Sequence, residues 1–469
     1  MLHRSPTLTR LFIYALFGIS MMGSGLLGCK CTPEKTDENG PKTPKTNSAN
    51  LLLSEVISDA DIRTKIVTAV ASMTTVPRPV LDPDKISIRR CPCDSALLNI
   101  TLPTGWTITG VDGDPVAVIP PTKGESRNID LPITKNMVGN NFPISTFVEK
   151  NPEGDEPYSG SLVIEQFTIP TATPAKPAIK IAIFDSGLDE TFMPAPALGG
   201  QTNLCLGTGL DPAQTSIKGW DFMPGGTLND PFDDHPYKHG SRVAYLTARQ
   251  FNGAGVPVSM TPFKVLDKGN QGDLFGLICA METARKNNFK VFNMSLGYYG
   301  AEDAMLKTYV KRAVDDKIWI VAAAGNHYTE GGITPTDTTR NLSARKDKFY
   351  PAWFAKEFSR VLAATTAHLT SASALVGCNW QNYDQKYVVG VKEDMGCRFN
   401  IFRSSPVSIF GTSYAAPVLT GWLGTQLRNP ANAAADRTGD RTALLRSLPQ
   451  AVSGSQLYEN RYVFLKPMP

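Results

Sequence analysis

Short apolar runs alternate with amphipathic stretches from about residue 180 onward. Strands are predicted at 180–184, 260–266, 291–295, 319–323 and 360–365. Helices are predicted at 241–249, 273–287, 301–315 and 413–428. The run Trp319–Ala323 is apolar throughout, as expected for a strand that is buried on both faces of a sheet. This alternation predicts an α/β fold with a doubly wound, mainly parallel sheet and helices on both faces.

The last of these helices begins at a serine. Small residues surround Ser413 in the stretch Gly-Thr-Ser-Tyr-Ala-Ala-Pro at 411–417, and an apolar run at helical spacing follows. Backbone N–H groups at a helix start lack intrahelical partners and carry partial positive charge, so they would stabilise an oxyanion beside the serine. An ordinary N-cap is the alternative interpretation, because serine is a preferred cap residue.

An aspartate and a histidine precede this serine in the chain. Asp185 follows a buried strand and enters a glycine turn, where open α/β sheets place their chemistry. His239 opens a predicted helix in the stretch His-Gly-Ser. A weak nucleophile, a base of near-neutral pKa and a carboxylate that orients the base are the parts of a nucleophilic triad, and Ser413, His239 and Asp185 fit those roles. His235 is a competing base, but no glycine and helix follow it.

Five blocks in this order resemble the subtilisin-like serine proteases, or subtilases. They read Ile-Phe-Asp-Ser-Gly at 183–187, His-Gly-Ser at 239–241, Asn-Met-Ser-Leu-Gly at 293–297, Ala-Ala-Gly-Asn at 323–326, and the stretch at 411–417. The resemblance covers about residues 178–428 and implies a serine endopeptidase that needs no cofactor. Ser241, Tyr414 and Ala416 depart from the residues common in the family, but they replace none of the reacting groups.

The resemblance also implies further site residues. Asn326 matches the asparagine that donates to the oxyanion together with the backbone N–H of the serine. Ser295, Leu296 and Gly297 match a strand edge that pairs with extended substrate, with Gly297 keeping the pocket mouth free of a side chain. Gln271 and Gly272 resemble the opposite wall. Polypeptides are therefore the expected substrates.

The amino terminus resembles a bacterial lipoprotein signal. Arg4 and Arg10 precede an apolar run at 11–22, and Leu-Leu-Gly-Cys at 26–29 resembles a lipobox. Cleavage before Cys29 would leave a lipid-bearing cysteine that anchors the protein outside the cytoplasm, in the inner or the outer membrane. A simple secretory signal is the alternative. The formal charge of +4 over 469 residues gives no indication of a nucleic-acid partner.

Composition and patterning divide the rest of the chain. After the signal peptide at 1–28, a polar, proline-containing stretch at 29–50 is expected to be a disordered tether. Residues 51–168 begin with a helical pattern at 51–73 and continue in short alternating runs, which predicts a small, mostly β domain. It is either a cleaved prodomain or a retained accessory domain. A proline-containing linker at 169–178 leads to a catalytic domain at 179–469, and self-processing would cut between about Ile169 and Lys180.

Cysteines and acidic residues suggest further features. Cys378 and Cys397 bracket an insertion before the serine block and are a candidate disulfide, whereas Cys205 and Cys279 are candidate buried thiols. Cys91 and Cys93 are too close to pair comfortably with each other. Calcium is possible at a loop with Asp230, Asp233 and Asp234, although a solvated acidic loop is the favoured interpretation.

The leading hypothesis is a membrane-tethered, extracytoplasmic serine endopeptidase. The alternative is a surface binding or scaffold protein that keeps the fold and has no catalytic activity.

Overall fold

The computed structural model describes the chain in segments. They are residues 47–72, 80–109, 117–121, 129–130, 133, 135–141, 143–146, 167–193, 219–226, 230–326, 340–370, 375–378, 381–392, 399–400, 408–409, 411–451 and 457–464. The chain divides into two units, 1–42 and 43–469, and every described residue belongs to the second. The predicted signal peptide and Cys29 therefore lie outside the described residues. Within those residues, no helix combines the length and the apolar character needed to cross a membrane.

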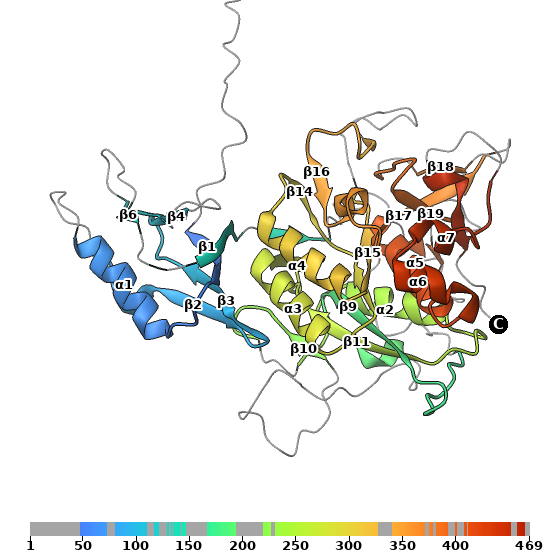
Figure 1. Ribbon diagram of the computed structural model, residues 1–469, viewed down its shortest axis with the longest axis horizontal. Coiled ribbons are helices and arrows are strands. Elements are labelled where there is room, and N and C mark those ends of the chain that lie inside the picture. Colours follow the sequence, from blue (N-terminus) through green and yellow to red (C-terminus); the bar gives the residue numbers. More distant parts are fainter. Residues whose placement is uncertain are drawn as a thin grey trace, which may run out of the picture. The chain divides into compact units, whose positions relative to one another are not determined.

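A large sheet forms the centre of the fold (Figure 1). Its strands are β9 (Ile179–Asp185), β10 (Trp220–Asp221), β11 (Val258–Lys264), β13 (Val291–Met294), β15 (Trp319–Ala323), β17 (Val361–Leu369), β18 (Leu375–Gly377), β19 (Val388–Lys392) and β22 (Tyr462–Phe464). The order is β10-β11-β9-β13-β15-β17-β19-β22, and neighbours along this path are parallel. Strand β18 pairs antiparallel with β17.

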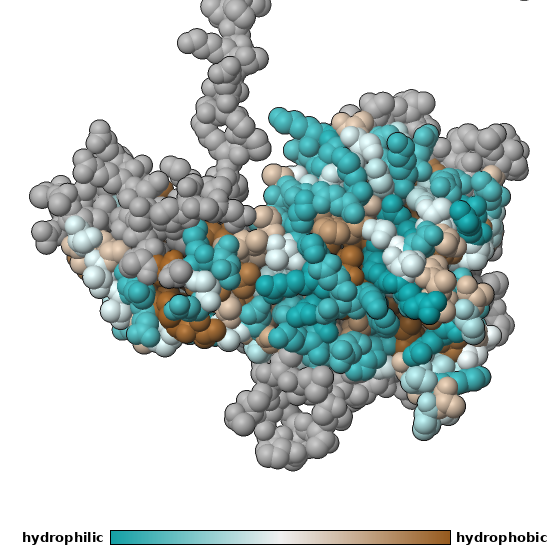
Figure 2. All heavy atoms as spheres, in the orientation of Figure 1, coloured by the Kyte–Doolittle hydropathy of each residue, from teal (hydrophilic) through white to brown (hydrophobic). Residues whose placement is uncertain are grey.

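Helices cover both faces of this sheet. Because successive strand residues point to opposite faces, Ile181 and Ile183 of β9 belong to one apolar cluster, whereas Ala182 and Phe184 belong to the other. The first cluster includes α2 (His239–Arg249) and α5 (Thr412–Gln426), and the second includes α3 (Leu274–Lys286) and α4 (Ala304–Asp315). Hydrophilic side chains cover the outer side of α3 and α4 (Figure 2). The predicted doubly wound α/β fold is confirmed.

The N-terminal region combines two small antiparallel sheets with one helix. Strands β1 (Ser48–Leu53), β2 (Ser87–Cys91), β3 (Asp94–Thr101) and β7 (Lys135–Asn140) form a sheet in the order β2-β3-β1-β7, and α1 (Asp59–Ala71) packs in the same apolar cluster. Strands β4 (Thr107–Thr109), β5 (Ala117–Ile119) and β6 (Ile129–Asp130) form the second sheet. The predicted β-rich character is confirmed.

Two predictions at the start of this region are wrong. The helix predicted at 51–73 begins only at Asp59, where Ser58 caps it, and the tether predicted at 29–50 ends within β1. The apolar run Leu51–Leu53 pairs with β3 on one side and with β7 on the other. Three apolar residues fit a central strand as well as a helix, so periodicity alone misplaces them.

Shorter elements complete the described chain. They are η1 (Pro83–Lys85), β8 (Pro143–Ser145), η2 (Glu190–Phe192), β12 (Gln271–Asp273), β14 (Tyr298–Gly300), β16 (Lys348–Tyr350), η5 (Ala352–Lys356), β20 (Phe399–Asn400), β21 (Ser408–Ile409), η6 (Pro430–Asn432), α6 (Ala433–Thr438), α7 (Arg441–Leu445) and η7 (Tyr458–Asn460). Of these, β8 pairs antiparallel with β12.

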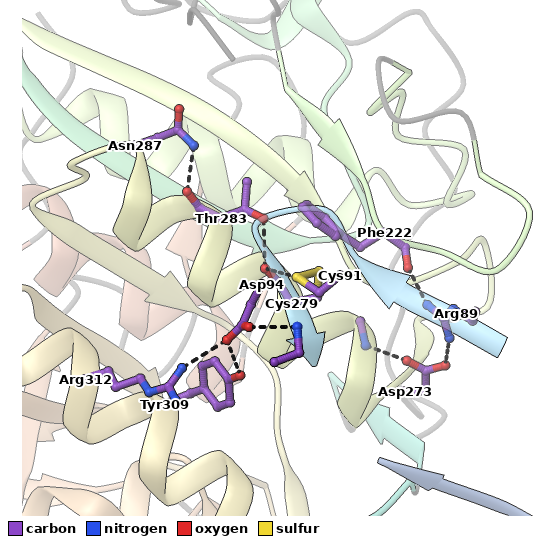
Figure 3. The surroundings of a disulfide bond; sticks show 12 residues. Arg89, Cys91, Asp94, Phe222, Asp273, Cys279, Thr283, Asn287, Tyr309 and Arg312 are labelled. Carbon is purple, nitrogen blue, oxygen red and sulfur yellow. Dashed lines mark hydrogen bonds and ion pairs between the residues drawn. A yellow bond between two sulfur atoms is a disulfide. The ribbon is translucent and has the colours of Figure 1, made fainter. Parts of the chain in front are cut away.

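A disulfide joins the N-terminal region to the main body of the fold. Cys91 at the end of β2 is bonded to Cys279 in α3, and both residues are buried (Figure 3). The prediction that Cys279 is a buried thiol is therefore wrong, because a sequence does not reveal which distant cysteines meet. Cys378 is also disulfide-bonded. Its pairing with Cys397 stays a prediction, since Cys397 and Cys205 lie outside the described residues.

Candidate active site

An aspartate and a histidine meet at the carboxyl end of β9. The strand order reverses between β9 and β13, and the crevice beyond such a reversal is where open α/β sheets bind ligands. Asp185 is the last residue of β9 and His239 the first of α2, and Nδ1 of His239 lies 2.7 Å from Oδ1 of Asp185. Both side chains are fully buried. A carboxylate only accepts hydrogen bonds, so Nδ1 carries a proton and the ring orientation is held.

Close packing brings α2 against the end of β9. A Cβ added at Gly240 would lie 2.3 Å from the backbone oxygen of Gly187 and 3.1 Å from Cβ of Asp185. The backbone N–H of Gly240 donates to Oγ of Ser186, the residue after Asp185. A larger residue at 240 would therefore separate Asp185 from His239.

Asp233 hydrogen-bonds both to the residue that follows β9 and to the first turn of α2. Its Oδ1 accepts from Oγ of Ser186 at 2.9 Å and from the backbone N–H of His235 at 3.2 Å. Its Oδ2 accepts from the backbone N–H and the hydroxyl of Ser241 in the first turn of α2. A buried carboxylate at a helix start is stabilised by the helix dipole as well as by these donors.

The favoured interpretation of a solvated acidic loop holds for Asp230 and Asp234, which are exposed, but not for Asp233. Asp233 is fully buried rather than solvated, and Asp234 pairs with Lys264 at 2.6 Å. Among the described residues, no group of acidic, histidine and cysteine side chains is arranged to hold a metal. The carboxylates at 233 and 234 organise the protein itself, which the sequence spacing did not indicate.

Ser413 lies in the first turn of α5, as predicted. It is buried, and its backbone oxygen accepts a 2.7 Å hydrogen bond from Oγ of Ser295, just beyond β13. The ring of the next residue, Tyr414, lies 5.1 Å from the ring of His239. Helices α2 and α5 therefore place His239 and Ser413 in the same part of the molecule.

Asn326 lies beside the start of α5. Its Oδ1 accepts from the backbone N–H of Thr412 at 3.1 Å and from the Thr412 hydroxyl at 3.3 Å. Because the amide oxygen is held in this way, the orientation of the amide is defined, and Nδ2 lies toward Gly411, 3.6 Å from where a Cβ there would be. Gly411 has φ of 124°, a conformation that favours glycine.

Two residues that sequence reasoning missed support Asn326. The hydroxyl of Tyr299 donates to the backbone oxygen of Asn326 at 2.5 Å. The buried side-chain amide of Asn382 donates to that hydroxyl and to the backbone oxygen of Ala324, each at 2.8 Å. Neither residue belongs to a recognisable motif, so no sequence signal pointed to them.

A strand of the chain itself lies between the two walls that were predicted to bind substrate. Ser145 of β8 is paired with Gln271, and Ile144 with Gly272, in antiparallel register. On the other side, Ser145 and Gly297 exchange two backbone hydrogen bonds, of 3.0 and 2.9 Å.

This strand ends at the serine. The residue that follows β8 is Thr146, and its backbone oxygen accepts a 3.4 Å hydrogen bond from Oγ of Ser413. Thr146, Ser145 and Ile144 are all buried. The chain therefore presents an extended peptide segment to Ser413, with a peptide carbonyl beside the hydroxyl.

Gly297 is tightly packed. A Cβ added at this residue would lie 2.2 Å from the backbone oxygen of Tyr350 and 2.6 Å from the ring of Phe349. Packing against β16 therefore requires glycine here, and the expected role at the pocket mouth stays a prediction. Leu296 is buried in the core. Gly297 contacts Ser145 through its backbone, and Ser295 contacts Ser413 through its hydroxyl.

His235 is close to the pair but differs from His239 in environment. The ring centroids of the two histidines are 6.4 Å apart, and Nδ1 of His235 accepts from the backbone N–H of Tyr237. Burial, and then the proximity of His239, lower the pKa of His235 to about 4. It is therefore neutral at pH 7.

The fold and the site define an α/β protein with a buried aspartate–histidine pair and a serine at a helix start. The chain belongs to the subtilase family, whose model matches residues 176–448. It is 33% identical to subtilisin amylosacchariticus of Bacillus subtilis subsp. amylosacchariticus over 158 residues, which are 33% of this chain and 35% of that protein. It is also 33% identical to subtilisin E of Bacillus subtilis (strain 168) over 161 residues, 33% of this chain and 36% of that protein.

A relative from another genus also matches the chain. The extracellular serine proteinase of Thermus sp. (strain Rt41A) is 29% identical over 189 residues, covering 34% of this chain and 44% of that protein. The chain thus spans between about a third and less than half of the length of these three curated relatives.

Proposed function

We propose that this protein is a serine endopeptidase that hydrolyses polypeptides through an acyl-enzyme on Ser413. The observation that carries the proposal is the peptide segment at 143–146, which is paired along both walls of the site and brings a peptide oxygen to within 3.4 Å of Oγ of Ser413. An extended substrate bound in the same way would add a strand between the same two walls.

In this mechanism, Nε2 of His239 takes the hydroxyl proton of Ser413 as Oγ attacks the substrate carbonyl carbon. Asp185 holds the imidazole through Nδ1 and stabilises the cation that forms. The developing oxyanion is bound by the backbone N–H of Ser413 and by Nδ2 of Asn326. His239 then protonates the leaving amine, and a water molecule releases the acyl group by the reverse sequence of proton transfers.

The site residues act without a metal or an organic cofactor in this mechanism. Calcium, if bound, would have a structural role, and the described residues at 230–234 provide no cluster for it.

A scaffold protein without activity is the alternative. A fluorophosphonate distinguishes the two, because an activated serine displaces fluoride from phosphorus and becomes covalently labelled. The proposal predicts labelling at Ser413, located by peptide mass spectrometry, once the segment at 143–146 has left the site, no labelling of Ser413→Ala and strongly slowed labelling of His239→Ala. A folded chain with an open site that reacts no faster than Ser413→Ala would favour the scaffold.

The extracytoplasmic location is supported by the relatives, one of which is described as extracellular, and by the disulfide. Anchoring through a lipid on Cys29 is proposed from the lipobox-like stretch alone. Cys29→Ala should move the protein from the membrane fraction to the soluble fraction after cell disruption. Unchanged fractionation would argue against the lipid anchor.

A further inference from the structure

We propose that the N-terminal region remains on the enzyme as a covalently held inhibitor after the chain is cut just beyond Thr146, and that the Cys91–Cys279 disulfide holds it there. The proposal rests on the proposed function, because the cut is made by Ser413. It concerns residues 48–146, which run from β1 to the segment that ends at Ser413.

The segment at 143–146 has the position of a bound substrate. It is the middle strand between β12 and Gly297, and its carboxyl end lies at Ser413. While it stays there, no other polypeptide can pair with the same two edges. The N-terminal region therefore blocks the site that it also uses as a substrate.

The same geometry places the cut earlier than the linker at 169–178. Phe167 and Ile169 are buried in the cluster that contains α2 and α5, and the ring of Phe167 packs against Tyr245 at 5.4 Å. A cut beyond Thr146 leaves these residues on the catalytic body, whereas a cut at 169–178 would remove them. In the reaction, the C–N bond breaks, water supplies oxygen to the acyl carbon, and its proton passes to the new amine.

Polar contacts from β2 and β3 hold the region to the body. Arg89 of β2 pairs with Asp273 and donates to the backbone oxygen of Phe222 at 2.8 Å, as Figure 3 shows. Asp94 of β3 accepts from the Tyr309 hydroxyl at 2.8 Å and from Arg312 at 3.1 Å.

Apolar contacts add to this surface. Leu52, Leu97 and Ile144 belong to the same core cluster as α3 and α4. Hydrolysis of one peptide bond breaks none of these contacts, so the cut alone does not release the region.

The disulfide keeps the cut region attached to the enzyme. Without it, the cut region would leave by dissociation and would be diluted. With it, rebinding of the strand at 143–146 is intramolecular, and the effective concentration of such a tethered group is typically in the millimolar range. Cys91 and Cys279 are 1% and 2% exposed, so a thiol reagent has little access while the region is docked.

The link can be opened chemically after unfolding. An external dithiol would give two electrons and two protons to the disulfide, leaving Cys91 and Cys279 as thiols and the reagent as a disulfide. Cys93 is disulfide-bonded as well, so the experiment must separate the two links. Cys93→Ala keeps the Cys91–Cys279 bond and serves as the matched control. Replacing Cys91, Cys93 and Cys279 by alanine removes both.

The first measurement is electrophoresis of the purified full-length protein in denaturant, with and without dithiol. Wild type and Cys93→Ala should run as one species without dithiol and as two with it, and the larger fragment should begin at Phe147 or Val148. The triple variant should give two species in both conditions. Fragments of Cys93→Ala that separate without dithiol, or a new amino terminus later than Val148, would overturn the proposal.

The second measurement is hydrolysis of a chromogenic peptide across a 100-fold dilution. The specific activity of Cys93→Ala should stay low and constant, whereas that of the triple variant should rise by about 10- to 100-fold as the cut region dissociates. Equal activity of the two proteins, with the region attached to the first, would overturn the inhibitory role. If neither protein hydrolyses peptide or reacts with a fluorophosphonate at any dilution, the proposed function itself fails.

Discussion

The side-chain amide of Asn326 is oriented by contacts that its motif does not reveal. Thr412 holds the amide oxygen, and Tyr299 and Asn382 hold the backbone of the loop. The sequence identifies the residue, but the direction in which its amide points depends on residues from three other parts of the chain.

Asn326→Ala should lower kcat by about 100- to 1000-fold and leave KM nearly unchanged, because the amide stabilises the transition state rather than the bound substrate. This magnitude is the established cost of losing such a donor in subtilisin. Steady-state hydrolysis of a chromogenic peptide measures both constants. A rise in KM by the same factor, with kcat unchanged, would assign Asn326 to substrate binding instead.

His235 should make the folded protein sensitive to acid. Its pKa is about 4 in the folded protein, below the ordinary value of 6.5, so the unfolded chain binds more protons between these values. Stability from the neutral ring is present above pH 6.5 and is lost as the pH falls toward 4. Neighbouring charges also change the pKa of this ring. It is raised by Asp185 and Asp234 and lowered by His239 and Arg242.

His235→Asn keeps an acceptor for the Tyr237 N–H and removes the titration. In a Ser413→Ala background, which prevents self-digestion, the free energy of unfolding should fall between pH 7 and 4.5 by about 2 kcal/mol less in His235→Asn than in its parent. Urea unfolding at the two pH values measures this difference. Parallel losses would show that His235 is not the group responsible.

At the scale of elements, the alternation of strands and helices could be predicted because buried parallel strands are apolar throughout and helices are periodic. Strand β15 was predicted with its observed bounds, and α2, α3 and α5 to within two residues at each end. Strand β1 was missed because its pairing partners, β3 and β7, are remote in sequence.

The junction of β9 and α2 depends on one carboxylate that was misread as part of an exposed loop. Asp233→Ala would leave buried donors of Ser186, Ser241 and His235 without their acceptor. We expect a loss of about 3 kcal/mol in the free energy of unfolding, since several buried hydrogen bonds to a charged group are removed.

The measurement is urea unfolding in the Ser413→Ala background. Asp230→Ala, at an exposed residue of the same loop, is the control and should change stability by less than about 0.5 kcal/mol. Similar effects of the two substitutions would contradict the structural role of Asp233.

For the whole molecule, motifs predicted the candidate site residues but not the segment of the chain that lies beside them. Asp185, His239, Asn326 and Ser413 could be named because each lies in a short local pattern at an element boundary. The position of the segment at 143–146 and the Cys91–Cys279 bond could not, because both depend on how two separately patterned regions pack. The sequence also left open whether the N-terminal region is a prodomain or an accessory domain.

Both functional proposals depend on Ser413 being an activated nucleophile. Fluorophosphonate labelling of the diluted triple cysteine variant, in which the site is expected to be open, tests this most directly. We predict one label per chain, located on Ser413, with none when Ser413→Ala is added and far slower labelling when His239→Ala is added. A folded protein that stays unlabelled, or a label on another residue, would contradict the account.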